Sequence, residues 1–210
     1  RQGDYYLAGD ELGVEADGVW GGCGAELLGL EGAAESTAFG RLSDNERPDG
    51  SGPLTCRTKA TRRSGYDFVF SVPKSVSVVW ALTGDVAVVR AVELAVSETM
   101  QLAERDAHTR VRVGGANETR ITGNLTWAQF THRTTRPIDG IPDPHLHCHV
   151  FVFNATFDSV ENRWKAVDIG VIKQAAPYYE AVFHARLAAR LQELGYEIRQ
   201  VGRSFELARV

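Results

Sequence analysis

Three histidines alternate along one short stretch of the chain. His145, His147 and His149 are separated by single residues and are followed at once by the apolar run 150–153. Because side chains two positions apart on a strand project from the same face, a strand here would place the three imidazoles side by side. Neighbouring imidazoles can bind one divalent cation. The stretch holds half of the six histidines in the chain, so it predicts a metal site.

The third ligand of such a site has two candidates. Three consecutive alternate positions on one strand span too far, at about 6–7 Å per step, to surround one ion easily. His132 ends another strand candidate, and antiparallel pairing of the two strands would bring it beside His147 and His149. We therefore predict His132, His147 and His149 as ligands, with His145 as the alternative to His132.

Strands that alternate with helices are expected to position these histidines. Apolar residues spaced by three and four predict helices over residues 74–82, 86–106 and 177–194. Alternating patterns predict strands over residues 66–70, 110–113, 121–132, 146–155, 197–201 and 205–207. Asp85 is expected to cap the second helix, and Gly195 to follow the third. The pattern predicts an α+β fold, with a central antiparallel sheet and flanking long helices.

The composition indicates one substantial globular domain. The 210 residues are 43% hydrophobic, too hydrophobic for a disordered chain. We expect a single, monomeric domain over residues 1–210 that is part of a longer protein, because the chain begins with Arg1. Three cysteines without close spacing indicate a reducing compartment. No secretory signal is visible and no apolar run approaches the length of a membrane span, so we expect a cytoplasmic protein.

Local positive charge contrasts with an acidic average. The net charge of −4 argues against broad, non-specific binding of nucleic acid. Four cations nevertheless fall within residues 57–63: Arg57, Lys59, Arg62 and Arg63. Arg133 and Arg136 follow another strand candidate. A solvated loop and a DNA-binding surface both explain such clusters, and the charges alone leave the two open.

Four stretches resemble the conjugative relaxases of the F-plasmid class, which are HUH endonucleases with a three-histidine motif. They are residues 4–6 with 20–30, residues 65–77, residues 130–136 with 143–149 and Asn154, and residues 124–125 with the helix that ends at 194–196. The resemblance implies a bacterial enzyme that cuts one DNA strand at a plasmid transfer origin. It implies single-stranded or hairpin DNA as the partner, Mg²⁺ or Mn²⁺ as the cofactor, and a helicase domain elsewhere in the full-length protein.

The resemblance also implies roles for individual residues. Carried over by motif, the metal ligands are His132, His147 and His149. His145 stands where the family often has glutamine. Asp67 matches an aspartate that orients a ligand histidine and assists the tyrosine proton. Lys74 and Arg136 match positions near the DNA or the site.

The nucleophile of the implied reaction is a tyrosine that attacks the scissile phosphate and stays attached to the 5′ end. The family carries two groups of tyrosines near its N-terminus, and the first usually makes the initial nick. Tyr5 and Tyr6 resemble the second group more closely. The candidates are therefore Tyr5, Tyr6 and a tyrosine that precedes Arg1.

Other functions remain open. A rolling-circle replication initiator uses the same chemistry, although the fit to residues 65–77 disfavours it. A DNA-hairpin-binding module without nicking activity would lack the essential tyrosine. An unrelated three-histidine metalloenzyme is a third alternative, although an Fe(II) oxygenase usually has two histidines and a carboxylate. No GxxxxGK[ST] phosphate loop occurs in the sequence, so any helicase motor would lie outside the chain.

Overall fold

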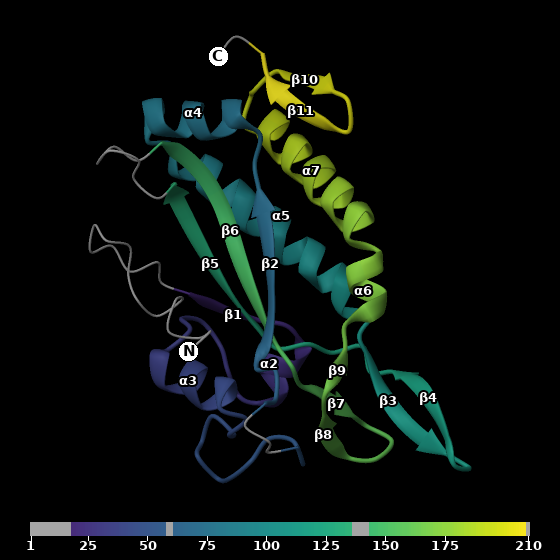
Figure 1. Cartoon of the computed structure of the whole chain (residues 1–210). Coiled ribbons are helices and arrows are strands. Elements are labelled where there is room, and N and C mark those ends of the chain that lie inside the picture. Colours follow the sequence, from purple (N-terminus) through teal and green to yellow (C-terminus); the bar gives the residue numbers. More distant parts are fainter. Residues whose placement is uncertain (1–17, 58–60, 136–142, 209–210) are drawn as a thin grey trace. The chain divides into compact units, whose positions relative to one another are not determined.

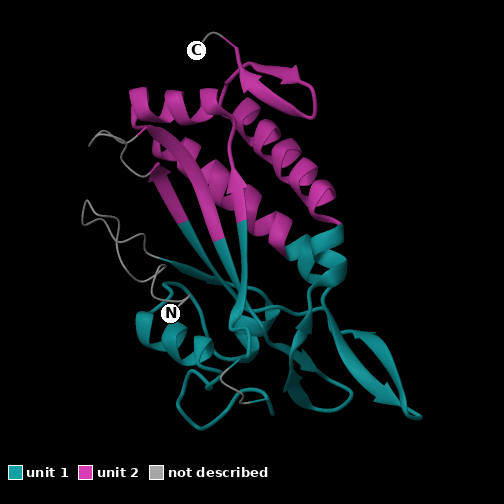
Figure 2. Cartoon of the chain, in the orientation of Figure 1, with its two compact units in different colours: residues 1–68, 101–130, 150–174 teal, residues 69–100, 131–149, 175–210 magenta. Residues whose placement is uncertain are grey.

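The structure, a computed structural model, describes residues 18–57, 61–135 and 143–208 (Figure 1). Four residues predicted to act in the site lie outside this part of the chain, namely Tyr5, Tyr6, Lys59 and Arg136. The backbone divides into two compact units (Figure 2). Unit 1 is residues 1–68, 101–130 and 150–174, and unit 2 is residues 69–100, 131–149 and 175–210. The single domain expected over residues 1–210 stays a prediction.

The described residues form a mixture of helices and strands. The helices are α2 (Cys23–Leu27), α3 (Ser36–Ser43), α4 (Lys74–Thr83), α5 (Val86–Glu104), α6 (Gly170–Gln174) and α7 (Ala176–Glu193). The strands are β1 (Val19–Gly21), β2 (Gly65–Ser71), β3 (His108–Val113), β4 (Ala116–Ile121), β5 (Trp127–Thr134), β6 (Pro144–Phe153), β7 (Thr156–Asp158), β8 (Arg163–Lys165), β9 (Val167–Asp168), β10 (Ile198–Val201) and β11 (Ser204–Leu207). Among the described residues, no helix is long and apolar enough to cross a membrane.

The largest sheet has the strand order β1-β5-β6-β2. A second sheet has the order β4-β3-β9, and β7-β8 and β10-β11 form two-stranded ribbons. The pairs β1–β5, β3–β4, β3–β9, β7–β8 and β10–β11 are all antiparallel. Antiparallel sheets combined with long helices confirm the predicted α+β fold.

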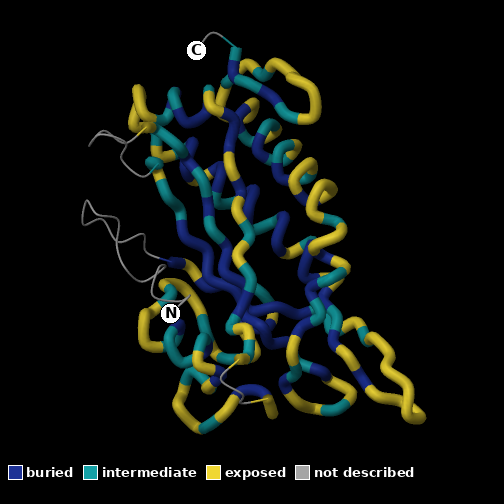
Figure 3. The backbone as a smooth tube through the Cα atoms, in the orientation of Figure 1, coloured by how far each residue is buried: buried dark blue, intermediate teal, exposed yellow. Residues whose placement is uncertain are grey.

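The core of unit 1 is built around Phe39 of α3. Its ring lies 5.1 Å from Phe153 and 5.8 Å from Phe130, centroid to centroid, in edge-to-face geometry. The second half of β6, residues 150–153, is buried throughout (Figure 3). Burying each of these large side chains stabilises the fold by about 1.5–3 kcal/mol. The apolar run that follows the histidines is therefore the strand segment that anchors β6 in this core.

A buried carboxylate holds α2 in unit 1. Glu104, only 4% exposed, accepts hydrogen bonds through Oε1 from the backbone N–H of Cys23, at 2.8 Å, and of Leu125, at 2.7 Å. Gly22, just before α2, has φ +94°, and a Cβ there would lie 2.3 Å from the Leu125 carbonyl oxygen. Only glycine fits this close approach without strain.

The three helices predicted over residues 74–82, 86–106 and 177–194 are present, with ends that differ by at most two residues from the prediction. Asp85 accepts a hydrogen bond at 2.8 Å from the backbone N–H of Ala87, which caps α5. Gly195 follows α7 with φ +89°, the left-handed conformation that ends many helices. Phe183 on α7 packs edge-to-face on Phe70 of β2 at 5.3 Å. The predicted helices and the strands predicted over residues 197–201 and 205–207 are thus confirmed.

The strand predicted over residues 121–132 is wrong, because Ile121 ends β4 and β5 begins only at Trp127. The chain turns between them at Gly123, whose φ is +63°. The side chain of Asn124 holds the turn, since it donates to the carbonyl of Phe157 and accepts from the Phe157 N–H. Helices α2 and α3 were not predicted, because short helices in a glycine-rich segment carry little apolar periodicity.

Candidate metal centre and basic pocket

Three imidazoles form a nearly equilateral triangle in unit 2. The ring of His132, on β5, lies 5.3 Å from that of His147 and 5.2 Å from that of His149, centroid to centroid. The His147 and His149 rings, both on β6, are also 5.2 Å apart. All three side chains are half-buried. The neighbouring strands β5 and β6 thus bring together the three predicted ligands.

The triangle matches the size of a three-histidine metal site. Imidazoles bound at about 2.1 Å to a tetrahedral ion have ring centroids about 5 Å apart. Among the described residues, however, no three His, Cys, Asp or Glu side chains are already arranged to hold an ion. The rings would therefore turn about their flexible χ2 angles to point at one centre. The distances between the three rings and their nitrogen donors fit a metal ion, and only the orientation of the rings would have to change.

Hydrogen bonding fixes the tautomer of His147. Its Nδ1 lies 2.9 Å from the carbonyl oxygen of His145, and since a carbonyl only accepts, Nδ1 carries the hydrogen. The lone pair is then on Nε2, the atom free to bind a metal. Burial lowers the pKa of His147 to about 4, so its ring is neutral at physiological pH. A neutral ring is the form that binds a metal ion.

His145 lies beside one corner of the triangle. Its ring centroid is 4.7 Å from that of His147, and its carbonyl accepts the His147 hydrogen bond described above. His145 thus supports the orientation of His147 through its backbone. The side chain between these two, Leu146, is fully buried on the opposite face of β6.

The segment 65–77 holds the first half of β6 in place. Ser77 accepts a hydrogen bond through Oγ from the N–H of Leu146 at 3.0 Å, and the exposed Lys74 donates from Nζ to the Pro144 carbonyl at 2.9 Å. Asp67 lies on β2, the neighbour of β6 in the sheet, with an exposed side chain. The stretches 65–77 and 143–149, noted separately in the sequence, therefore meet in the structure.

A basic pocket of about 380 Å³ lies in unit 1. Its lining includes three of the predicted DNA-binding residues, Arg57, Arg62 and Arg63. It also includes Arg163 and Lys165 of β8, which sequence reasoning missed. The two cations flank the buried Trp164, and this alternation of charged and apolar residues was the available signal.

Comparison with known proteins decides the family. The sequence profile of the TrwC relaxase matches residues 1–210. The chain belongs to the TrwC relaxase family. The chain is similar in sequence to the multifunctional conjugation protein TraI of Escherichia coli, with 35% identity over 214 residues. That match covers 96% of this chain but 12% of TraI, so the chain spans a small part of this relative.

Solved structures of the conjugative relaxase TrwC share the fold. A metal-bound TrwC in complex with oriT DNA is 33% identical, with a TM-score of 0.88, and is matched over 100% of this chain and 72% of TrwC. A copper-bound TrwC in complex with oriT DNA is 34% identical, with a TM-score of 0.86 and the same coverage of 100% and 72%. Metal-bound forms are therefore known for a relaxase of this fold.

Proposed function

We propose that this chain is a relaxase domain, an enzyme that nicks one strand of DNA at a plasmid transfer origin and stays attached to its 5′ end. The observation that carries the proposal is the triangle of His132, His147 and His149 in a chain of the TrwC relaxase family. The TrwC complexes with oriT DNA support the substrate. The alternative without nicking activity, a DNA-hairpin-binding module, becomes an outcome of the test below.

The three histidines would bind a divalent metal ion through neutral nitrogens. When bound, the ion would withdraw charge from the non-bridging oxygens of the scissile phosphate. Neutral ligands leave its whole positive charge for that purpose. We propose Mg²⁺ or Mn²⁺, and three nitrogen donors favour Mn²⁺ because Mg²⁺ prefers oxygen ligands.

A tyrosine oxygen would attack the phosphorus of the scissile phosphodiester. The bond from phosphorus to the tyrosine oxygen forms, the bond to the 3′ oxygen breaks, and that oxygen takes up a proton as it leaves. Tyrosine has an ordinary pKa near 10, so its proton needs an acceptor. We assign this role, or the orientation of a ligand histidine, to Asp67. Tyr5, Tyr6 and a tyrosine preceding Arg1 are the candidate nucleophiles.

The partner of the domain is single-stranded or hairpin DNA of a transfer origin. We assign the contacts with its phosphates to the cations Arg57, Lys59, Arg62, Arg63, Lys74 and Arg136. Since the chain matches 12% of the multifunctional TraI, we propose that a helicase domain belongs to the full-length protein. The domain would act as a monomer in the bacterial cytoplasm.

The experiment is incubation with labelled single-stranded DNA of the transfer origin and Mn²⁺ or Mg²⁺, followed by denaturing electrophoresis. A labelled protein band that survives denaturation supports a covalent phosphotyrosine. DNA binding without such a band in the full-length protein, which includes any tyrosine that precedes Arg1, supports the binding-only module and overturns the relaxase. Peptide mapping of the adduct decides between Tyr5 and Tyr6, and adduct in a chain with both changed to Phe rules out both.

A further inference from the structure

The basic pocket of unit 1 is lined by five cations and, among the described residues, by no carboxylate. Its polar and aromatic lining residues are Thr55, Thr61, Asn154 and Trp164, and its cations are Arg57, Arg62, Arg63, Arg163 and Lys165. Glu161 and Asp158, which are outside the lining, pair with Arg163 and Lys165 and offset part of this charge. An anionic ligand in the pocket would offset the remainder.

Arg62 is the cation that most needs a partner. Its guanidinium is half-buried and donates from Nη2 to the backbone carbonyl of Asn154 at 2.9 Å. Burial lowers the pKa of Arg62, and a carbonyl does not neutralise a charge. Within the described residues no carboxylate pairs with it. A desolvated, unneutralised cation gains stability from an anion placed against it.

Asn154 positions this part of the pocket. Its backbone carbonyl accepts the hydrogen bond from Arg62. Its side-chain Nδ2 donates to the carbonyl of Arg63 at 3.0 Å, and its backbone N–H donates to the carbonyl of Ser64 at 2.8 Å. Its Oδ1 accepts a hydrogen bond at 3.1 Å from the N–H of Val167. Asn154, only 8% exposed, therefore holds the segment that carries both arginines through its backbone and its side chain together.

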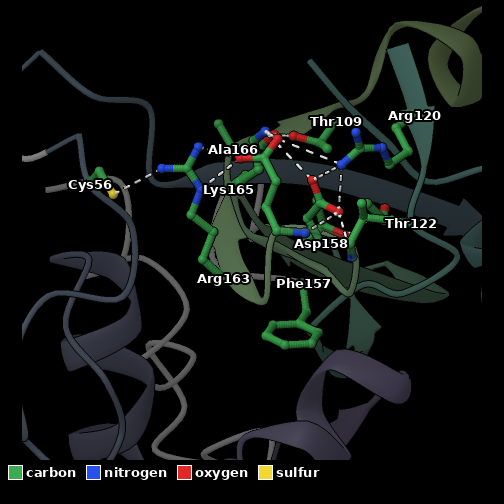
Figure 4. A network of polar contacts seen from close by, with 12 residues as sticks. Cys56, Thr109, Arg120, Thr122, Phe157, Asp158, Arg163, Lys165 and Ala166 are labelled. Atoms are coloured by element: carbon green, nitrogen blue, oxygen red, sulfur yellow. Dashed lines mark hydrogen bonds and ion pairs between the residues drawn. The ribbon is translucent and has the colours of Figure 1, made fainter. Parts of the chain in front are cut away.

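The two cations of β8, Arg163 and Lys165, form ion pairs with nearby carboxylates. Lys165 contacts Glu161 at 2.8 Å and Asp158 at 3.6 Å, and Arg120 contacts Asp158 at 2.7 Å. Arg163 also pairs with Glu161. Figure 4 shows Arg163, Lys165, Asp158 and Arg120 in this arrangement. Three cations share two carboxylates, so the network keeps a net positive charge and holds the side chains in fixed directions.

We propose that this pocket binds a phosphate group of the DNA strand, with Arg62, Arg163 and Lys165 as its contacts. The inference rests on the proposed function and adds a defined phosphate site to it. Guanidinium groups match the fork geometry of phosphate oxygens. A cavity of about 380 Å³ falls at the lower end of ligand pockets, about 300–1,000 Å³, which is large enough for one nucleotide's sugar and phosphate.

The test is the salt dependence of DNA binding. Fluorescence anisotropy is measured with a labelled origin strand that lacks the scissile phosphate, in the presence of metal, at several KCl concentrations. Arg62→Gln and Arg163→Gln each should lower the slope of log affinity against log salt by about 0.7. The matched control is Arg203→Gln, an exposed arginine in the β10–β11 turn outside the pocket, whose slope should equal that of the wild type.

Unchanged slopes in both pocket variants, with wild-type binding intact, would overturn the phosphate site while leaving the relaxase proposal in place. A full-length wild-type protein that forms no covalent adduct with the full origin strand would instead overturn the proposed function. Calorimetry with pyrophosphate separates the two sources of phosphate. If Arg62→Gln abolishes pyrophosphate binding without changing the DNA slope, the pocket takes a free anion and the DNA assignment is wrong.

Discussion

The imidazole of His132 on β5 lies 5.2 Å from that of His149 on β6, with the two rings inclined at 73°. They meet because β5 and β6 are neighbours in the sheet. A slip of either strand by one residue would turn its side chains to the other face and separate the rings. The candidate metal centre therefore depends on strand register as much as on residue type.

Replacing His147 by Ala should abolish the covalent DNA adduct, because it removes one corner of the triangle and the ligand whose tautomer is fixed. Calorimetry should show loss of Mn²⁺ binding in the same variant. The matched control is His145→Gln, which removes the neighbouring imidazole but keeps the backbone carbonyl that orients His147. This control should keep both activities; full adduct formation by His147→Ala would disprove the ligand assignment.

The half-buried ring of His147 predicts acid sensitivity. Its pKa is about 4 in the folded chain, against an ordinary value of 6.5, so the unfolded chain binds the proton first as the pH falls. The stability therefore decreases as the pH is lowered from about 6.5 to about 4. Thermal unfolding with a chelator present measures this. His147→Gln should show a shallower decrease over the same range, and an identical decrease would refute the assignment.

Glu104 should stabilise the fold mainly as a hydrogen-bond acceptor and only to a smaller extent through its negative charge. Glu104→Ala leaves the N–H groups of Cys23 and Leu125 without their acceptor and should cost about 2–5 kcal/mol of unfolding free energy. Glu104→Gln keeps an acceptor oxygen, and burial already raises the carboxyl pKa, so its cost should be about 1 kcal/mol. Urea denaturation measures both, and equal costs would show that the charge matters.

The turn before α2 should tolerate only glycine. Gly22→Ala would place a methyl group against the Leu125 carbonyl at a positive φ, and we expect a loss of about 2–4 kcal/mol. Gly29→Ala is the control, since φ there is +69° but nothing lies within 4 Å of the added Cβ. It should cost about 1 kcal/mol. Thermal unfolding measures the loss of stability in both variants. The excess loss in Gly22→Ala over Gly29→Ala is the cost of the steric clash with the Leu125 carbonyl.

Sequence patterns predicted the helices and strands that are determined by residues close together in the chain. Helix α5 has a cap at Asp85 and regular apolar spacing, and β6 has its alternating histidines, so both were recognised. The break between β4 and β5 was not, because Asn124 holds it through hydrogen bonds to Phe157, far along the chain. Local sequence does not encode such a partner.

The candidate site shows the same division. The approach of His132 to the histidine strand could be predicted on the assumption that the two strands are neighbours in one sheet, and the resemblance to relaxases implied the same three ligands. The basic pocket could not, since it joins residues 55–57 and 61–63 to Asn154 and residues 163–166, in part through the backbone carbonyl of Asn154. Charge counting identified Arg57, Arg62 and Arg63 but gave no reason to add Arg163.

Cys148, between His147 and His149, turns its thiol to the opposite face of β6, where it is fully buried. Burial raises its pKa to about 12, so it is almost entirely protonated and unreactive while the strand is in place. Cys23 and Cys56 are exposed and should be alkylated before Cys148. The rate of alkylation at Cys148 therefore reports how often the strand that carries the histidines opens.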